Sequence, residues 1–159
     1  MKDLTRSQID IFVSLSTVFA VILLDRVTKI FFVGLLSLGE SLPVIRNALH
    51  MTMVHNTGIA FGLFKNQGIV FIIIPIIAVV LLIFNVFYYR NTKELSRMYI
   101  CGFSMILGGA IGNLIDRISY GYVIDFIDFR IWPVFNIADS AITIGACIIA
   151  VKCLRLSVK

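Results

Sequence analysis

Residues 98–117, MYICGFSMILGGAIGNLIDR, decide the fold of this chain. The run from Met98 to Ile115 contains no charged residue, and Asp116 and Arg117 follow it directly. A helix needs roughly 20 apolar residues to cross about 30 Å of hydrocarbon. This stretch therefore predicts a membrane-spanning helix that ends beside polar groups.

The composition of the whole chain agrees with a membrane protein. Hydrophobic residues make up 59% of its 159 positions, and the mean hydropathy is +0.98. Soluble domains are only about half apolar. We expect a single domain over residues 1–159, because nothing in the middle resembles a linker and only three prolines occur.

Four apolar segments are candidate transmembrane helices. They cover residues 11–36, 69–89, 98–115 and 134–153. In the first segment the apolar run stops at Leu24, which is too short to cross, so the helix has to continue through Asp25, Arg26 and Lys29. Acids interrupt the basic N-terminal region and no small-residue cleavage site follows, so a cleaved signal peptide is not favoured.

The charge distribution predicts the orientation. The net charge is +5, and the basic excess gathers at both termini and in the loop 90–97. Because cytoplasmic loops carry an excess of Lys and Arg, we expect both termini in the cytoplasm and segments 37–68 and 116–135 outside. The positive net charge is thus explained by the orientation in the membrane, and no nucleic acid partner is expected.

Polar residues are expensive inside a membrane and mark function there. In this chain they collect at the predicted outer ends of three helices and in the outer loops, which predicts one polar pocket at the outer boundary of the bilayer. The residues concerned are Asp25, Thr28, Lys29, Asn56, Asn113, Asp116, Arg117, Asp125, Asn136, Asp139 and Ser140.

Several of these residues allow two interpretations. Asp25 and Lys29, spaced i and i+4, either belong to the pocket or only neutralise a helix end. Asp116 and Arg117 are adjacent and point apart, so we expect Arg117 to be a positioning group and Asp116 to face the headgroups. The GxxxG pair Gly108/Gly112 predicts close helix packing, which would press a neighbouring side chain into the pocket.

The outer loops suggest surface roles and no metal site. Phe126, Phe129, Trp132 and Phe135 suit an interfacial belt, and Asp128 with Arg130 suits a solvated surface pair. Between Gly39 and Gly58, residues 44–45 and 51–54 are candidate strands. His50 and His55, five apart, would face opposite sides of such a strand, so they predict no metal centre.

Asp125 and Asp139 are candidates for acid–base chemistry. Two carboxylates close together cannot both ionise cheaply, so the pair shares a proton and can activate water. Transporters also use paired acids, so a small proton- or ion-coupled transporter using Asp25, Asp125 and Asp139 is the alternative. Polar groups that fail to continue across the midplane weigh against a carrier.

Five strings in this order resemble the lipoprotein signal peptidases, or signal peptidase II family. They are LDRVTK (24–29), HNTGIAFG (55–62), GGAIGNLIDR (108–117), VIDF (123–126) and FNIADS (135–140). The likeness covers nearly the whole chain. Ile59 is a small departure, since many members have Ala there, and it affects only our expectation of local packing.

The resemblance implies an all-α integral membrane fold with four transmembrane helices and a small extracytoplasmic β-rich element, here within residues 38–64. It implies an aspartic endopeptidase of the bacterial cytoplasmic membrane, which cleaves a prolipoprotein before its diacylglyceryl-modified cysteine. Membrane lipid and the lipidated prolipoprotein are its expected partners, and we expect a monomer without cofactor or metal.

The resemblance also assigns the site residues. Asp125 and Asp139 are the expected catalytic pair. The residues expected to hold the substrate backbone or orient the carboxyls are Asp25, Asn56, Gly58, Asn113, Arg117 and Asn136.

Overall fold

The computed structural model describes residues 5–58, 73, 76, 77, 80, 84 and 97–157. Within this part, the elements follow the order α1, β1, β2, α3, β3 and α4. The predicted helix over residues 69–89 lies almost wholly outside the described residues. Among the described residues, three helices, α1, α3 and α4, are long and apolar enough to cross a membrane by length and composition.

Helix α1 spans Arg6–Leu35 and is 30 residues long. Its start is fixed by a capping box: the Thr5 hydroxyl accepts from the Gln8 backbone N–H, and the Gln8 side chain accepts from the Thr5 N–H. The helix continues without a break through Asp25, Arg26 and Lys29, as predicted. It begins five residues before the predicted boundary at residue 11, because the cap lies in the polar N-terminal segment.

Helix α1 has apolar side chains at its surface and charged side chains in the interior, the reverse of a water-soluble helix. Large apolar side chains such as Phe12 and Ile30 are exposed, at 70% and 71%. The buried residues of the helix are Val21, Asp25 and Lys29. An apolar exterior around a polar interior is stable only where hydrocarbon surrounds the protein, so this pattern supports a membrane-spanning helix.

Helix α3 spans Arg97–Tyr120 and α4 spans Ile137–Ser157. The structure extends α3 five residues beyond the predicted end at 115, and α4 starts three residues after the predicted start at 134. The predicted outer segment 116–135 therefore contains the last turn of α3.

Glycines hold these helices close together, which confirms the packing interpretation of the GxxxG pair. A Cβ on Gly108 would lie 2.9 Å from the Val21 side chain of α1, and one on Gly112 would lie 2.8 Å from Asp25 Oδ2. Gly109 faces the other way, against the Ala138 carbonyl of α4. Helix α3 thus packs against both α1 and α4.

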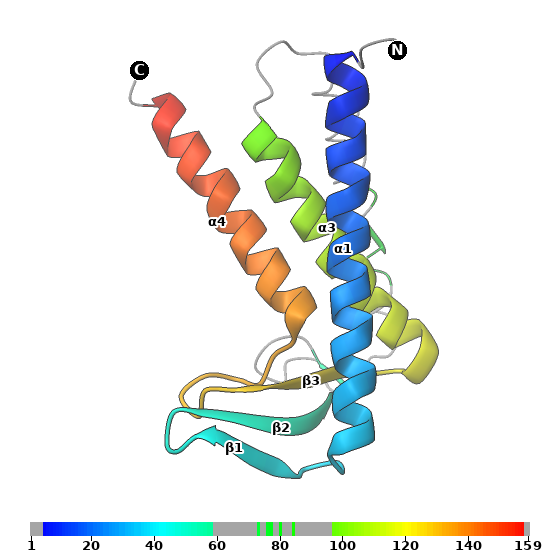
Figure 1. Ribbon diagram of the computed structural model, residues 1–159, viewed down its shortest axis with the longest axis vertical. Coiled ribbons are helices and arrows are strands. Elements are labelled where there is room, and N and C mark those ends of the chain that lie inside the picture. Colours follow the sequence, from blue (N-terminus) through cyan, green and yellow to red (C-terminus); the bar gives the residue numbers. More distant parts are fainter. Residues whose placement is uncertain are drawn as a thin grey trace.

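The helices extend from a small sheet toward the opposite end of the protein, and the last turns of α1 lie alongside the strands (Figure 1). Helices α1 and α3 run toward the sheet, and α4 runs away from it. As a result, the first turn of α1 and the last turn of α4 lie at the same end of the protein, opposite the sheet. The N-terminal end of α4 and the C-terminal ends of α1 and α3 come together near the strands.

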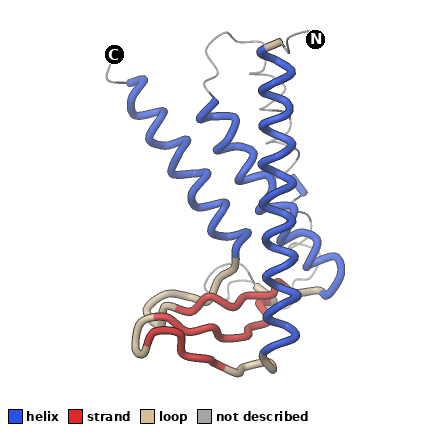
Figure 2. Tube along the Cα trace, in the orientation of Figure 1, coloured by secondary structure: helices blue, strands red, loops and turns tan. Residues whose placement is uncertain are grey.

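In the described part of the chain, the sheet has three antiparallel strands in the order β1-β2-β3 (Figure 2). Strands β1 (Ser41–Ile45) and β2 (Leu49–Asn56) fall in the predicted β-rich segment 38–64. The third, β3 (Val123–Asp128), comes from the segment that we expected to be an outer loop. It is a strand because it pairs with β2, from His50 opposite Asp128 to Asn56 opposite Val123.

The position of β3 corrects two further expectations. Phe126 is 2% exposed and stacks on Phe32 of α1 with ring centroids 4.4 Å apart, so it belongs to the core and not to an interfacial belt. Asp128 is 6% exposed and accepts from the Thr52 hydroxyl at 2.7 Å. Only its partner Arg130 lies at the surface, so the two do not form a solvated surface pair.

Candidate active site

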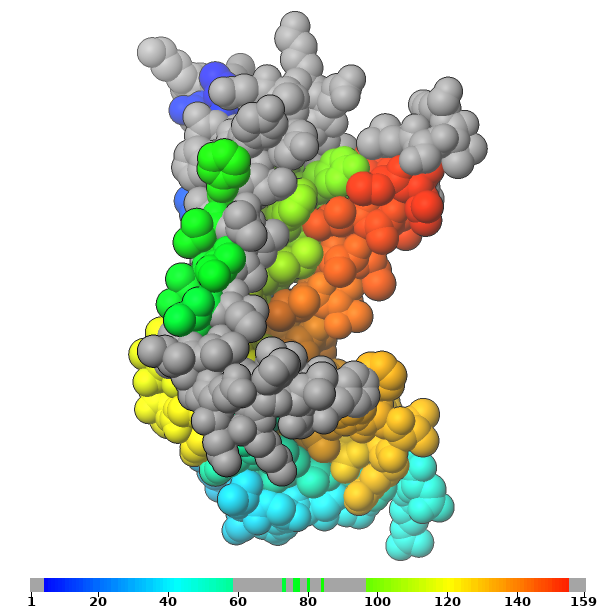
Figure 3. Space-filling view, turned by 180° about the vertical axis from the view of Figure 1, so that it is seen from behind, coloured from blue at the N-terminus to red at the C-terminus, as the bar shows by residue number. Residues whose placement is uncertain are grey.

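The site forms where α1, α3, β3 and the start of α4 meet, as the lopsided distribution of polar residues predicted. Asp25 comes from α1, Asn113 from α3, Asp125 from β3 and Asp139 from the first turn of α4. Seen from behind, the surface of the protein is hollowed between α4 and the sheet (Figure 3). The first turn of α4 borders this hollow.

Asp125 is 1% exposed and is held by two side-chain amides. Asn56 Nδ2 donates to Asp125 Oδ2 at 2.9 Å, and Asn136 Nδ2 donates to Asp125 Oδ1 at 2.7 Å. Asn56 can reach because Val54 pairs with Asp125 across the β2–β3 ladder, which puts Asn56 two residues further along on the same face. The two amides fix both carboxylate oxygens.

Burial, and after it the neighbouring charge of Asp139, raises the pKa of Asp125 to about 7. Hydrogen bonds from Asn56 and Asn136 and the charge of Lys29 oppose this rise. The charge of Asp139 is therefore close enough to act on Asp125. Asp125 therefore has a pKa at which a carboxyl can hold or release a proton at neutral pH.

Asp139 is positioned by the N-terminal turn of α4. Its backbone N–H donates to Asn136 Oδ1 at 2.9 Å, and its Oδ2 accepts from the Asn136 backbone N–H at 3.3 Å. This reciprocal pair is the capping-box pattern, which stabilises a helix start. Asn113 Nδ2 donates to the other oxygen, Asp139 Oδ1, at 2.7 Å.

Asn113 and Asn136 connect the two acids. Asn136 Nδ2 lies 3.0 Å from Asn113 Oδ1, and the same nitrogen also donates to Asp125 and to the Ile124 carbonyl, at 3.2 Å. Asn136 is fully buried, and Asn113 is 6% exposed. A direct chain of hydrogen bonds therefore runs from Asp125 through both amides to Asp139.

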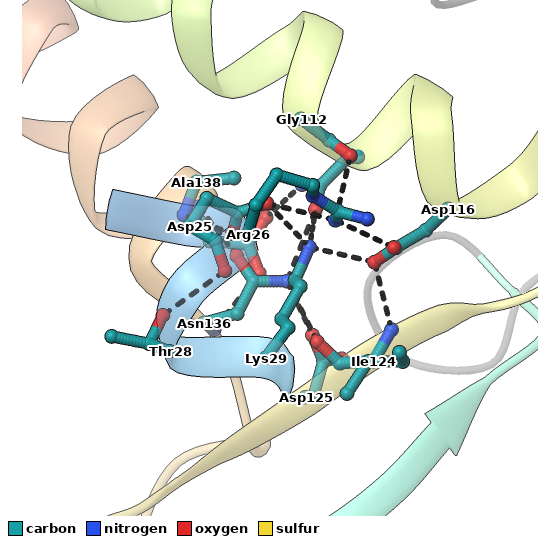
Figure 4. A network of polar contacts seen from close by, with 12 residues as sticks. Asp25, Arg26, Thr28, Lys29, Gly112, Asp116, Ile124, Asp125, Asn136 and Ala138 are labelled. Atoms are coloured by element: carbon teal, nitrogen blue, oxygen red, sulfur yellow. Dashed lines mark hydrogen bonds and ion pairs between the residues drawn. The ribbon is translucent and has the colours of Figure 1, made fainter. Parts of the chain in front are cut away.

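A cluster of four charged residues lies next to these amides (Figure 4). We call Asp25, Arg26, Lys29 and Asp116 the charge cluster. Lys29 Nζ lies 3.0 Å from Asp25 Oδ2 and 2.6 Å from Asp116 Oδ2. Arg26 Nη2 lies 3.0 Å from Asp25 Oδ2 and 2.6 Å from Asp116 Oδ1. Two cations thus balance two anions.

The charge cluster also ties the helices to each other and to the sheet. Asp25 Oδ1 accepts from the Ala138 N–H at the start of α4, at 3.2 Å, and Asp116 Oδ2 accepts from the Ile124 N–H of β3, at 3.1 Å. Asp25 and Asp116 have no exposed surface, and Lys29 is 1% exposed. The expectation that Asp116 faces the headgroups is therefore wrong: the pairing of two cations draws it inward.

The remaining predicted residues lie around the acids. Gly58 donates its N–H to Asn56 Oδ1 at 3.0 Å, which turns the Asn56 amide nitrogen toward Asp125. Arg117 is half-buried, donates to the Asn113 carbonyl at 3.5 Å and interacts electrostatically with Asp139 and Asp125. The structure thus brings all eight predicted site residues into one region.

Sequence reasoning missed the part played by Arg26 and left that of Lys29 open. Their spacing from Asp25 is visible in the sequence, but their shared partner Asp116 is 90 residues away from Arg26 and on another helix. No sequence signal pairs these positions. Among the described residues, no group of three or more His, Cys, Asp and Glu side chains has the arrangement of a metal site.

Comparison with known proteins connects this geometry to a family. The model of the family described as signal peptidase (SPase) II matches residues 17–155. A lipoprotein signal peptidase from Halothermothrix orenii is 46% identical over 132 residues, which cover 83% of this chain and 88% of that protein. One from Moorella thermoacetica is 42% identical over 129 residues, covering 81% and 84%.

Solved structures agree with the fold. A structure described as that of a bacterial membrane enzyme has a TM-score of 0.79 and 34% identity, and the match covers 89% of this chain and 87% of that one. A second with the same description has a TM-score of 0.77 at 34% identity, covering 89% and 92%. The extent of these matches, together with the family model, shows that this chain belongs to the signal peptidase II family and is a membrane peptidase.

Proposed function

We propose that this protein removes the signal peptide from diacylglyceryl-modified prolipoproteins and cuts before the lipidated cysteine. Membership of the family and the names of its relatives support signal-peptide removal as the reaction class. The lipid chains of such a substrate lie in the outer leaflet, and its signal helix spans the bilayer. A site at the outer ends of membrane helices meets the scissile bond where the substrate already lies.

Asp125 and Asp139 are the catalytic pair in this proposal. The single observation that carries it is the chain of hydrogen bonds through Asn136 and Asn113 that joins the two carboxyls. In addition, burial and the charge of Asp139 raise the pKa of Asp125 to about 7. Such a pair retains one proton near neutral pH. The ionised carboxyl takes a proton from the attacking water, and the protonated one donates a hydrogen bond to the scissile carbonyl oxygen.

The surrounding residues orient the pair and the substrate. Asn56 and Asn136 hold Asp125, and Asn113 holds Asp139, so the carboxyl planes are set before substrate arrives. This preorganisation lowers the cost of reaching the transition state. Arg117 and Gly58 border the pair and are the proposed contacts to substrate backbone, and Asp25 acts through the charge cluster.

We further propose four transmembrane helices with both termini in the cytoplasm and the site on the extracytoplasmic face. The chain leaves β2 at the end of the protein that contains the sheet, and α3 begins at the opposite end (Figure 1). This arrangement supports the predicted additional helix over residues 69–89. The location of the first turn of α1 and the last turn of α4 at one end supports the common side of the termini.

The transporter alternative requires Asp25 as one of its three proton-carrying acids, and the partners of Asp25 weigh against that role. A proton relay needs carboxyls that can exchange protons with their neighbours. Asp25 has no exposed surface, and both its oxygens are taken by Arg26, Lys29 and the Ala138 N–H. Because donors engage both oxygens of this carboxylate and neither is exposed, Asp25 has no free oxygen with which to exchange a proton with the other two acids, and it is a poor relay group.

Cleavage of a purified diacylglyceryl-modified precursor tests the proposal. Asp125→Asn and Asp139→Asn should each lower kcat by about 100-fold or more, the range lost with a general acid or base. Asp128→Asn is the matched control, because it removes an acid from the opposite face of the same strand and should keep its cleavage rate. Mass spectrometry of the two fragments would give the cleavage position, and full activity of either dyad variant would refute the assignment.

A further inference from the structure

We infer that Lys29 is a positioning residue for peptide hydrolysis: its ammonium group fixes the side-chain amide of Asn113 so that the NH2 group faces Asp139. The inference rests on the proposed catalytic role of Asp125 and Asp139. It concerns a residue outside the predicted set of site residues, and it gives the charge cluster a part in catalysis in addition to its part in the fold.

The hydrogen bonds of Asn113 show how the orientation is set. Its Oδ1 lies 3.1 Å from Lys29 Nζ and 3.0 Å from Asn136 Nδ2, and its Nδ2 lies 2.7 Å from Asp139 Oδ1. An ammonium group has only donors, whereas an amide has a donor end and an acceptor end. Lys29 can therefore face only the oxygen of Asn113.

The opposite orientation of the amide is costly on both sides. A flipped Asn113 would direct its NH2 group at the Lys29 ammonium and at the Asn136 NH2 group, and its carbonyl oxygen at the Asp139 carboxylate. All these side chains are buried or half-buried, where an unpaired polar group costs most. The flip would leave Asp139 Oδ1 without the donor that holds it.

Lys29 is itself held in one place. Its Nζ contacts Asp25 Oδ2, Asp116 Oδ2 and Asn113 Oδ1, at 3.0, 2.6 and 3.1 Å. Three acceptors satisfy the three hydrogens of an ammonium group. These partners come from α1 and α3, and Figure 4 shows the Lys29 side chain directed into the cluster. The charge cluster thus fixes the donor, and the donor fixes Asn113.

Asn136 needs no such help, and this difference makes Lys29 specific to one acid. The Asn136 amide is oriented by backbone groups, since its Oδ1 accepts from the Asp139 N–H and its Nδ2 donates to the Ile124 carbonyl. The side chain of Asn113 has no backbone partner in the described part of the chain. Loss of Lys29 should therefore loosen Asp139 more than Asp125.

The test uses a charge-compensated variant, because Lys29→Met alone leaves an excess buried carboxylate that can prevent folding. In the double variant Lys29→Met/Asp116→Asn, one cation and one anion are lost together. Asn at position 116 can still accept from the Ile124 N–H. The matched control is Lys29→Gln/Asp116→Asn. It has the same charge as the Met variant and a side chain of the same length at position 29, but it keeps a donor for Asn113.

We expect the Met variant to lose about 10- to 100-fold in kcat, the cost of a misplaced catalytic group, with KM changed by less than about twofold. The Gln variant should recover part of this loss. All assays are run well below the thermal unfolding midpoint of the least stable variant in detergent. An unchanged kcat in the Met variant would overturn the inference, as would a Gln variant equally impaired.

A double-mutant cycle with Asn113→Ala separates positioning from general destabilisation. If Lys29 acts through Asn113, adding the Lys29→Met/Asp116→Asn change to Asn113→Ala produces no further loss of kcat. Losses that multiply would overturn the inference. The dyad assignment is read separately: if Asp125→Asn and Asp139→Asn are inactive while the Met variant is fully active, only the role of Lys29 fails.

Discussion

The charge cluster and the proposed catalytic pair differ in the partners of their acids. In the charge cluster, Asp25 and Asp116 each contact two cations. Asp125 and Asp139 form no ion pair within the described residues and are held by neutral amides instead. Amides orient a carboxylate without supplying the charge that keeps it ionised. Neighbouring buried acids can therefore serve structure or chemistry, depending on whether their partners are charged.

The contrast predicts opposite consequences of the same substitution, and this is the largest effect we expect. Asp25→Asn leaves two cations with one anion in a buried cluster, and should lower the free energy of unfolding by about 3–5 kcal/mol. Asp125→Asn removes a poorly solvated acid that lacks a cationic partner, and should not lower stability at neutral pH. Thermal and denaturant unfolding in detergent would compare the two variants. Equal destabilisation would contradict the contrast.

The second prediction concerns the pH dependence of stability. Because the pKa of Asp125 is raised from 3.8 to about 7 on folding, the folded state binds a proton that the unfolded state has released between these values. The free energy of unfolding should therefore fall as the pH rises from about 4 to 7, by up to roughly 4 kcal/mol.

Unfolding measured across this range checks the sign and the size of the effect. The slope should be much smaller in Asp125→Asn, which has no carboxyl to titrate at this position. Asp25→Asn serves as the comparison and should keep the slope of the unmodified protein. A slope of the same size in Asp125→Asn would show that another group titrates.

The smallest predicted effect sharpens the comparison by disturbing the start of α4, which carries Asp139. A Cβ on Gly109 would press on the carbonyl of Ala138, which precedes Asp139 and whose N–H donates to Asp25. Gly109→Ala should cost about 1–3 kcal/mol of stability by overpacking and should lower kcat by shifting α4 from α3. Gly34→Ala is the control, because a Cβ there meets nothing within 4 Å. Normal kcat in Gly109→Ala would show that α4 tolerates the shift.

Much of the fold could be predicted because hydrophobic length is a local property. The apolar runs identified three of the helices that the structure describes, and the charges within α1 did not interrupt it. The strand β3 was missed because its Phe126 and the nearby Phe129 also fit a membrane surface. Only pairing with β2 distinguishes a strand from a surface loop here. The register between two distant segments cannot be predicted from the sequence of either segment.

The amino-acid sequence alone determined the membrane class, the three helical spans that the structure describes and the region where polar residues gather, because each follows from composition and spacing along one segment. Only the tertiary structure decided which acids meet cations and which meet amides. Asp116 turns inward to Arg26 and Lys29, whereas Asp125 meets Asn56 and Asn136. These partners lie on different helices and strands, and the chemistry of a buried carboxyl depends on what the fold places within a few ångströms of it.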